Sequence, residues 1–191
     1  MTDTIVSPDQ TRNGYLKFAA GGVLTGLLTP LLPSLIDKIV RAPGDFRIAL
    51  VAVPFAVLIF VLVRRSSANP WWAAPVAAVI TMLAFVCAVN AAIWIDGQVG
   101  DVAKVVRNIC AGLAGGFVGS ALMALGISLL PLGSRDIVAW MPMLVIGTVA
   151  GTLLALDSAL DLDLTSLLYP LWQAGVAVGL AMALQRVTAL R

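Results

Sequence analysis

Long apolar runs separated by short polar connections make up most of this chain. Six runs are long enough, or nearly long enough, to cross a bilayer as helices: residues 18–36, 48–63, 71–95, 109–132, 137–156 and 167–184. A helix needs roughly 20 apolar residues to span the hydrocarbon core, and only helices or closed barrels satisfy every backbone polar group there. The pattern therefore predicts an all-α, polytopic membrane bundle with about six transmembrane helices.

The composition favours a single membrane domain. Hydrophobic residues make up 60% of the 191 residues and charged residues only 12%, which excludes a water-soluble globular domain. Residues 1–14 are too few to fold alone and are predicted to be a short cytoplasmic segment, whereas residues 15–191 form the transmembrane domain. The first apolar run is longer than the core of a signal peptide and follows Asp3 and Asp9, so we expect it to be retained.

Basic residues are distributed unequally between the two sides that six crossings would define. The side richer in Lys and Arg is cytoplasmic by the positive-inside rule, which predicts that both termini are inside. Arg exceeds Lys and no sorting motif is recognised, so we expect a multi-pass protein of a bacterial inner membrane. The net charge of +2 is too small to indicate a nucleic-acid partner. The predicted cytoplasmic side carries Arg12, Lys17, Arg64, Arg65, Arg135, Arg186 and Arg191, and the other side carries Lys38, Arg41, Arg47, Lys104 and Arg107.

Small residues recur four positions apart inside the runs, a spacing that places them on one face of a helix. Gly22 and Gly26 form such a pair in the first run, as do Gly116 and Ser120 in the fourth. In lipid, small faces let helices approach closely, so the first interpretation is a compact bundle. The alternative is a pathway along the fourth run, where Gly112, Gly115, Gly116 and Gly119 leave little side-chain bulk on one face.

The two halves of the chain resemble each other. Five of eight positions agree between residues 70–77 and residues 170–177, which open the third and sixth runs. Halves 15–95 and 101–188 would each have three crossings, and an odd number forces them to run in opposite directions across the membrane. Inverted repeats are common in secondary transporters, whose sites are often built from interrupted helices. The interruptions expected here are at Pro30, Pro33, Gly126 and Pro131.

The residue types that are missing restrict the chemistry. The chain has no histidine, and all of its acidic residues are aspartate. Sites built on imidazole, and catalysis that depends on His or Glu, are therefore excluded. We expect no enzymatic activity, no cofactor and no metal. Asp157, Asp161 and Asp163 are interpreted as a solvated acidic loop, with a cation site as the less favoured alternative.

Uncharged polar residues within the runs are the candidate pathway-lining residues. Asn90 and Gln173 stand out, because an amide is costly to bury in hydrocarbon without a partner. Each could face a solute or could bond to a neighbouring helix, and the second explanation is the commoner one. The full set of candidates is Asn90, Gln173, Thr25, Thr29, Ser120, Gly116 and Gly119.

These features favour a small passive channel or facilitator for an uncharged or weakly polar solute. Charged residues lie at or beyond the ends of the runs, so a proton-coupled carrier that uses a buried carboxylate is disfavoured. The alternative is a non-catalytic subunit or assembly factor of a larger membrane complex, for which small-residue faces are equally natural. The expected partners are the lipid bilayer and either further copies of the chain or a partner membrane subunit.

Overall fold

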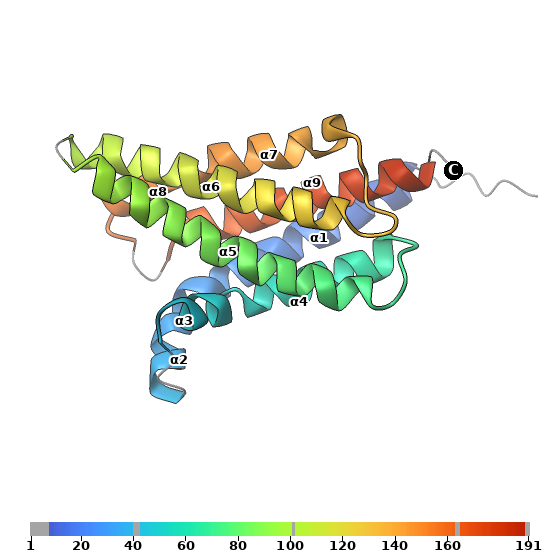
Figure 1. Cartoon of the computed structure of the whole chain (residues 1–191), viewed down its shortest axis with the longest axis horizontal. Helices are drawn as coiled ribbons and strands as arrows, with labels where there is room; N and C mark the ends of the chain where they lie inside the picture. Colours follow the sequence, from blue (N-terminus) through green and yellow to red (C-terminus); the bar gives the residue numbers. More distant parts are fainter. Residues whose placement is uncertain (1–7, 40–42, 101, 163–164, 190–191) are drawn as a thin grey trace, which may run out of the picture.

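Helices joined by short loops make up the part of the chain that the structure describes. The computed structural model describes residues 8–39, 43–100, 102–162 and 165–189, and its course is shown in Figure 1. Helices account for 84% of the structure, and no strand occurs in these ranges. The predicted all-α fold class is confirmed.

Long helices run back and forth along a common bundle axis, so the start of α1 and the end of α9 lie at the same end of the bundle (Figure 1). α1 begins at Pro8, within the segment predicted to precede the membrane domain, and that boundary stays a prediction. The elements in chain order are α1 (Pro8–Leu28), the 3-10 turn η1 (Thr29–Leu31), α2 (Leu32–Ile39), α3 (Gly44–Val51), α4 (Val53–Ser66), α5 (Ala73–Gln98), α6 (Lys104–Ser128), α7 (Ile137–Gly151), α8 (Leu153–Ala159) and α9 (Leu168–Ala189).

Four helical stretches are long and apolar enough to cross a membrane. They are Arg12–Ile39, Ala73–Gln98, Lys104–Ser128 and Ile137–Ala159, and they match four of the six predicted runs. α3 and α4 make a fifth if they form one span, although they meet at an angle of 51°. α9, which covers the sixth run, is not among the four; it carries Gln173, Gln185 and Arg186.

Proline accounts for the break in the first span. The first span changes to a 3-10 turn at Thr29–Leu31, where Pro30 and Pro33 each lack the N–H that an α-helix requires. This interruption was expected from the sequence. The one expected in the fourth run is wrong, because α6 continues through Gly126 and ends at Ser128, before Pro131. A single glycine is tolerated inside a helix that is packed on its neighbours.

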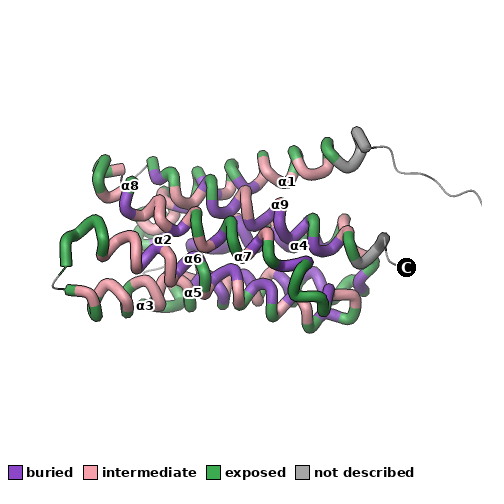
Figure 2. Tube along the Cα trace, turned by 90° about the horizontal axis from the view of Figure 1, so that it is seen from above, coloured by how far each residue is buried: buried purple, intermediate pink, exposed green. Residues whose placement is uncertain are grey.

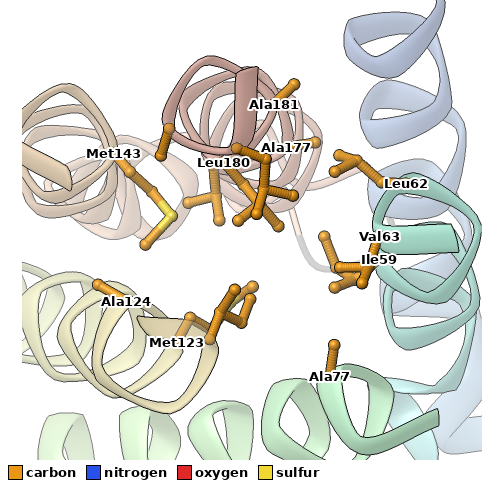
Figure 3. Close-up of a cluster of buried hydrophobic side chains, with 14 of the residues drawn as sticks. Ile59, Leu62, Val63, Ala77, Met123, Ala124, Met143, Ala177, Leu180 and Ala181 are labelled. Carbon is orange, nitrogen blue, oxygen red and sulfur yellow. The ribbon is translucent and has the colours of Figure 1, made fainter. Parts of the chain in front are cut away.

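α9 occupies the centre of the bundle, as the buried segments of Figure 2 show, and it packs against α1, α4 and α7. Its Val176, Ala177, Leu180 and Ala181 are fully buried. Figure 3 shows Leu180 between the side chains of α4, α6 and α7, with Met123 and Met143 nearby. The outward faces remain apolar, as expected for helices that contact lipid, and include Leu24, Leu83, Ile93, Leu125 and Val149.

Close helix contacts explain two of the small-residue series. A Cβ atom on Gly22 or Gly26 would overlap the backbone of α9 at Ala174 or Pro170. On α6, Gly116 lies against the backbone of Gly147 in α7. Close backbone approach of this kind is the packing role that small residues have in membrane helices.

Candidate functional site

A cavity of about 410 Å³ lies on the side of α9 that faces α5, α6 and α8. Its wall is largely apolar, with flat areas where glycines of α6 face it. Pockets of roughly 300–1,000 Å³ with a few polar groups in an apolar wall are the usual form of a small-molecule site. The lining residues are Phe85, Ala88, Val89, Ala92, Ile93, Asp96, Asn108, Ala111, Gly112, Gly115, Gly116, Gly151, Leu154, Leu168, Tyr169 and Trp172.

Polar groups of the wall come from Asp96, Asn108, Tyr169 and Trp172. Asp96 Oδ1 lies 2.8 Å from Nε of Arg107, close enough for an ion pair, although the angle does not make a hydrogen bond. The carboxylate is therefore already balanced by a cation.

The indole of Trp172 is the unusual group in this wall. Its side chain is 6% exposed, yet its Nε1 has no hydrogen-bond partner in the part of the chain that the structure describes. The ring is held by contact with the Phe55 ring, whose centroid is 5.7 Å away, and by close packing against Gly119. Buried polar atoms are nearly always satisfied in native proteins, so this N–H, termed the open donor below, needs an explanation.

The start of α9 is fixed by Asp157 at the end of α8. Asp157 accepts hydrogen bonds from the Ser166 hydroxyl and from the backbone N–H groups of Leu167 and Leu168, the latter two at 2.9 and 3.2 Å. Such N-terminal N–H groups have no partner within the helix, and a carboxylate satisfies them while also favouring the helix dipole. This bridge positions Leu168, Tyr169 and Trp172 against the cavity.

The same contacts bear on the acidic loop. Asp157 is occupied by the start of α9, Asp161 is exposed, and Asp163 lies outside the described residues. No cluster of metal-ligating side chains occurs in the residues that could be searched.

Gln173, Thr29 and Thr25 come together at the contact between α9 and α1. Nε2 of Gln173 donates to Oγ1 of Thr29 at 2.8 Å, and that hydroxyl donates to the carbonyl of Thr25. The Gln173 amide is fully buried, and among the described side chains its Oε1 finds no donor. These residues join α9 to the broken part of α1 and do not line the cavity.

The remaining candidates are scattered. Asn90 is exposed on α5 and donates to Asp45 of α3 at 3.1 Å, which ties two helices together. Ser120 is buried and donates to the carbonyl of Gly116 within α6. Gly119 packs against Ala88 and the Trp172 ring. Of the seven predicted residues, Gly116 alone lines the cavity.

Sequence reasoning missed the role of Trp172. Trp172 is 6% exposed and lines the cavity, whereas Trp72, its counterpart in the sequence comparison of the two halves, is 43% exposed. The available signal was that Trp172 immediately precedes the candidate Gln173 in a helix with few charges. Comparisons with family models, curated proteins and solved structures give no match.

Proposed function

We propose that the protein is a small passive facilitator for an uncharged or weakly polar solute, which binds in the cavity between α5, α6, α8 and α9. The observation that carries the proposal is the cavity itself, a partly open and largely apolar space of about 410 Å³. A few polar groups in an apolar wall suit an uncharged or weakly polar solute.

The proposed topology has six crossings, with both termini on the cytoplasmic side of a bacterial inner membrane. The alternating direction of the long helices supports an even number of crossings (Figure 1). The end of the bundle that holds the start of α1 and the end of α9 also holds the α4–α5 and α6–α7 connections, with Arg64, Arg65 and Arg135. This clustering agrees with the positive-inside rule.

An inverted arrangement of two halves is also proposed. α1 packs along α9 and α6 packs along α5, so the first helix of each half lies against the last helix of the other. α4 packs on α5 as α7 packs on α9, which is the neighbour pattern of an inverted repeat. The contact positions differ, since Gly26 meets Pro170 near the start of α9 whereas Gly115 meets Ala88 farther along α5. The correspondence is therefore one of helix neighbours and not of residues.

Solute flux into liposomes tests the proposed function. Stopped-flow light scattering would measure the entry of urea, glycerol, erythritol and butyramide, with sodium gluconate as the charged solute. We expect faster entry of at least one uncharged solute than into empty liposomes, and no effect on the salt. Equal rates with and without protein for the whole panel would contradict the proposal.

A cavity-filling variant links flux to the site. Leu154 of α8 lines the cavity, so Leu154→Trp fills part of the space and is expected to abolish the flux; Leu154→Phe is a milder second variant. Leu156 lies on the same helix, is exposed and does not line the cavity, so Leu156→Trp is the matched control and keeps wild-type flux. Flux that survives in a folded Leu154→Trp protein would place the pathway elsewhere.

An accessory subunit is the second candidate function. The observation in its favour is the pair α2 and α3, which projects from one end of the bundle (Figure 1). The projection exposes Leu35, Ile39 and Phe46 and is braced by a 2.6 Å ion pair between Asp37 and Arg47. A braced apolar projection is suited to contact with another membrane protein. If this candidate function is right, substituting Leu35, Ile39 and Phe46 by alanine would release a stoichiometric partner. Neither the wild-type protein nor this variant would then conduct solute in liposomes.

A further inference from the structure

The cavity between α5, α6, α8 and α9 has two unlike ends. α5 and α6 run antiparallel, so lining residues near their connection mark one end and lining residues farther from it mark the other (Figure 1). The first end, termed the mouth below, is lined by Ile93, Asp96 and Asn108. The second, termed the inner end, is lined by Phe85 and Trp172. Phe85 and Asp96 are eleven residues apart on α5, so the cavity extends about 16 Å along that helix.

Exposure falls from the mouth to the inner end. Ile93 is 62% exposed, and the side chain of Asp96 is 47% exposed. Phe85 and Trp172 are each 6% exposed. Farther along α9, Leu180 is fully buried in the core that Figure 3 shows. The mouth is therefore the accessible end, and a molecule that enters there comes to rest with its leading end against Phe85 and Trp172.

The polarity of the wall follows the same order. At the inner end the indole nitrogen of Trp172 is buried, so Phe85, Ala88 and the indole present carbon to a bound molecule. At the mouth, Asp96 and Asn108 supply a carboxylate and an amide. Asn108 is partly exposed, and its amide makes no hydrogen bond within the described residues. An amide both donates and accepts, so it suits the hydroxyl or amide group of a ligand.

The charges near the mouth favour a ligand whose polar group is neutral. Nε of Arg107 lies 2.8 Å from Asp96, so the carboxylate of the wall already has its counter-ion. The wall contains no lysine or arginine that could balance an anion. A charged group that moved into this space would leave water without gaining a free partner of opposite charge, which is costly.

We infer that the cavity binds a neutral amphiphile with its apolar end first. The hydrocarbon rests against Phe85 and Trp172, and a hydroxyl or amide group stays at the mouth beside Asp96 and Asn108. The ligand class is the alcohols and primary amides that carry one hydrocarbon chain. This inference rests on the proposed function in that the solute belongs to this class, so butyramide is carried and urea, which has no apolar end, is not. Binding can be measured without transport.

Two photoreactive isomers of octanol test the orientation of the ligand. One isomer carries a diazirine near the tail of the chain, and the other carries it beside the hydroxyl. Each is photolysed with the wild-type protein in lipid nanodiscs, and the labelled residues are identified by mass spectrometry of the peptides. We expect the tail isomer to label residues 85–89 and 172, and the hydroxyl-side isomer to label residues 93–96 and 108. The same labelled residues for both isomers, or the reverse assignment, would overturn the inference.

A variant that shortens the cavity tests its depth. Val89 lines the cavity between the two ends, so Val89→Phe blocks the way to the inner end and leaves the mouth open. Competition with the photoreactive isomers gives the affinities of octanol and butanol. We expect Val89→Phe to weaken octanol binding about tenfold, a typical cost of overpacking, and to change butanol binding less than about twofold. Val79→Phe is the matched control, because Val79 is exposed on the same helix and does not line the cavity.

The remaining outcomes separate this inference from the proposed function. Equal losses for octanol and butanol in Val89→Phe would show that the chain does not reach the inner end, and would overturn the inference. Labels confined to the outer faces of the helices would overturn it as well, and the wild-type labelling decides the matter if Val89→Phe does not fold. Ordered labelling without flux of any solute would reject the proposed function alone. Flux of urea without labelling of the cavity would reject the inference alone.

Discussion

The two sides of α9 differ in how closely they are packed. Toward α1, Gly22 and Gly26 bring the two backbones into contact, and Gln173 bonds across to Thr29. Toward α5, α6 and α8, the same helix borders a cavity of about 410 Å³, and the Trp172 N–H is the open donor. Residues 172 and 173 are neighbours in sequence, so the difference comes from the opposing helices and not from the local sequence.

This contrast separates structural packing from a candidate binding site. Glycine pairs close the first contact so tightly that there is no room for a ligand. On the second side, a residue that could have filled the space is absent, although large apolar side chains are plentiful in this chain. α9 instead borders a partly open space on this side, with the exposed Ile93 in its lining, which leaves room for a small molecule.

The largest expected effect comes from breaking the tight side. A methyl group on Gly26 would overlap backbone atoms of Pro170, which cannot move as a side chain can. We expect Gly26→Ala to lower the free energy of unfolding by about 3 kcal/mol or more. Unfolding by SDS in mixed micelles would measure it. The control on the same helix is Gly14→Ala, whose new methyl would meet no described atom within 4 Å and which should be neutral or slightly stabilising.

A smaller effect is expected at the bridge that positions the cavity side of α9. Asp157→Ala removes three hydrogen bonds to the loop and the start of α9, which should lower the free energy of unfolding by about 1–2 kcal/mol. Asp161→Asn is the control, because Asp161 is exposed with φ of 54°, a conformation that Asn also adopts readily. Equal stability of the two variants would show that Asp157 does not anchor α9.

The two indoles provide a sharper comparison. Trp140→Phe breaks a buried bond and leaves the Ser134 carbonyl without this donor, so we expect a loss of about 1 kcal/mol in the free energy of unfolding. Trp172→Phe breaks no bond within the described residues, so its loss should be clearly smaller. Both variants would be measured in the absence of added ligand. A larger loss for Trp172→Phe would mean that its N–H already has a partner in the native protein.

The smallest effect is expected for Gln173→Leu. Interhelical hydrogen bonds between membrane helices contribute about 0.6 kcal/mol on average, and leucine also removes the Oε1 that has no donor among the described side chains. We therefore expect the free energy of unfolding to change by less than about 1 kcal/mol. Flux through the folded variant then separates two roles. Lost flux would support the predicted pathway contact, and retained flux would restrict Gln173 to packing.

The helical runs were predictable because lipid imposes a simple requirement on length and polarity. The ends of the helices were not, since backbone hydrogen bonding continues past the apolar run. α1 starts at Pro8 and α6 at Lys104, several residues before the predicted runs begin at residues 18 and 109. Proline predicted the break at Thr29–Leu31, but glycine did not break α6 at Gly126, because a packed helix tolerates glycine.

The cavity could not be predicted from hydrophobic periodicity. α5 is apolar on nearly every face, so nothing in its sequence indicates that Asn90 points outward to Asp45 while Phe85 and Val89 face the cavity. Trp172 would have been a stronger candidate than Asn90 if its surroundings had been known. Its significance depends on three helices that are distant in sequence, which a single sequence without alignment does not place together.

The most direct test of a self-sufficient, occupied cavity is native mass spectrometry of the protein extracted gently from its membrane. Wild-type protein and Leu154→Trp would be compared under identical conditions. We expect the wild type to appear alone or as a homo-oligomer that carries a neutral small molecule, and the variant to appear without that molecule. A second protein at fixed ratio, with no small-molecule difference between wild type and variant, would contradict the facilitator and identify an accessory subunit.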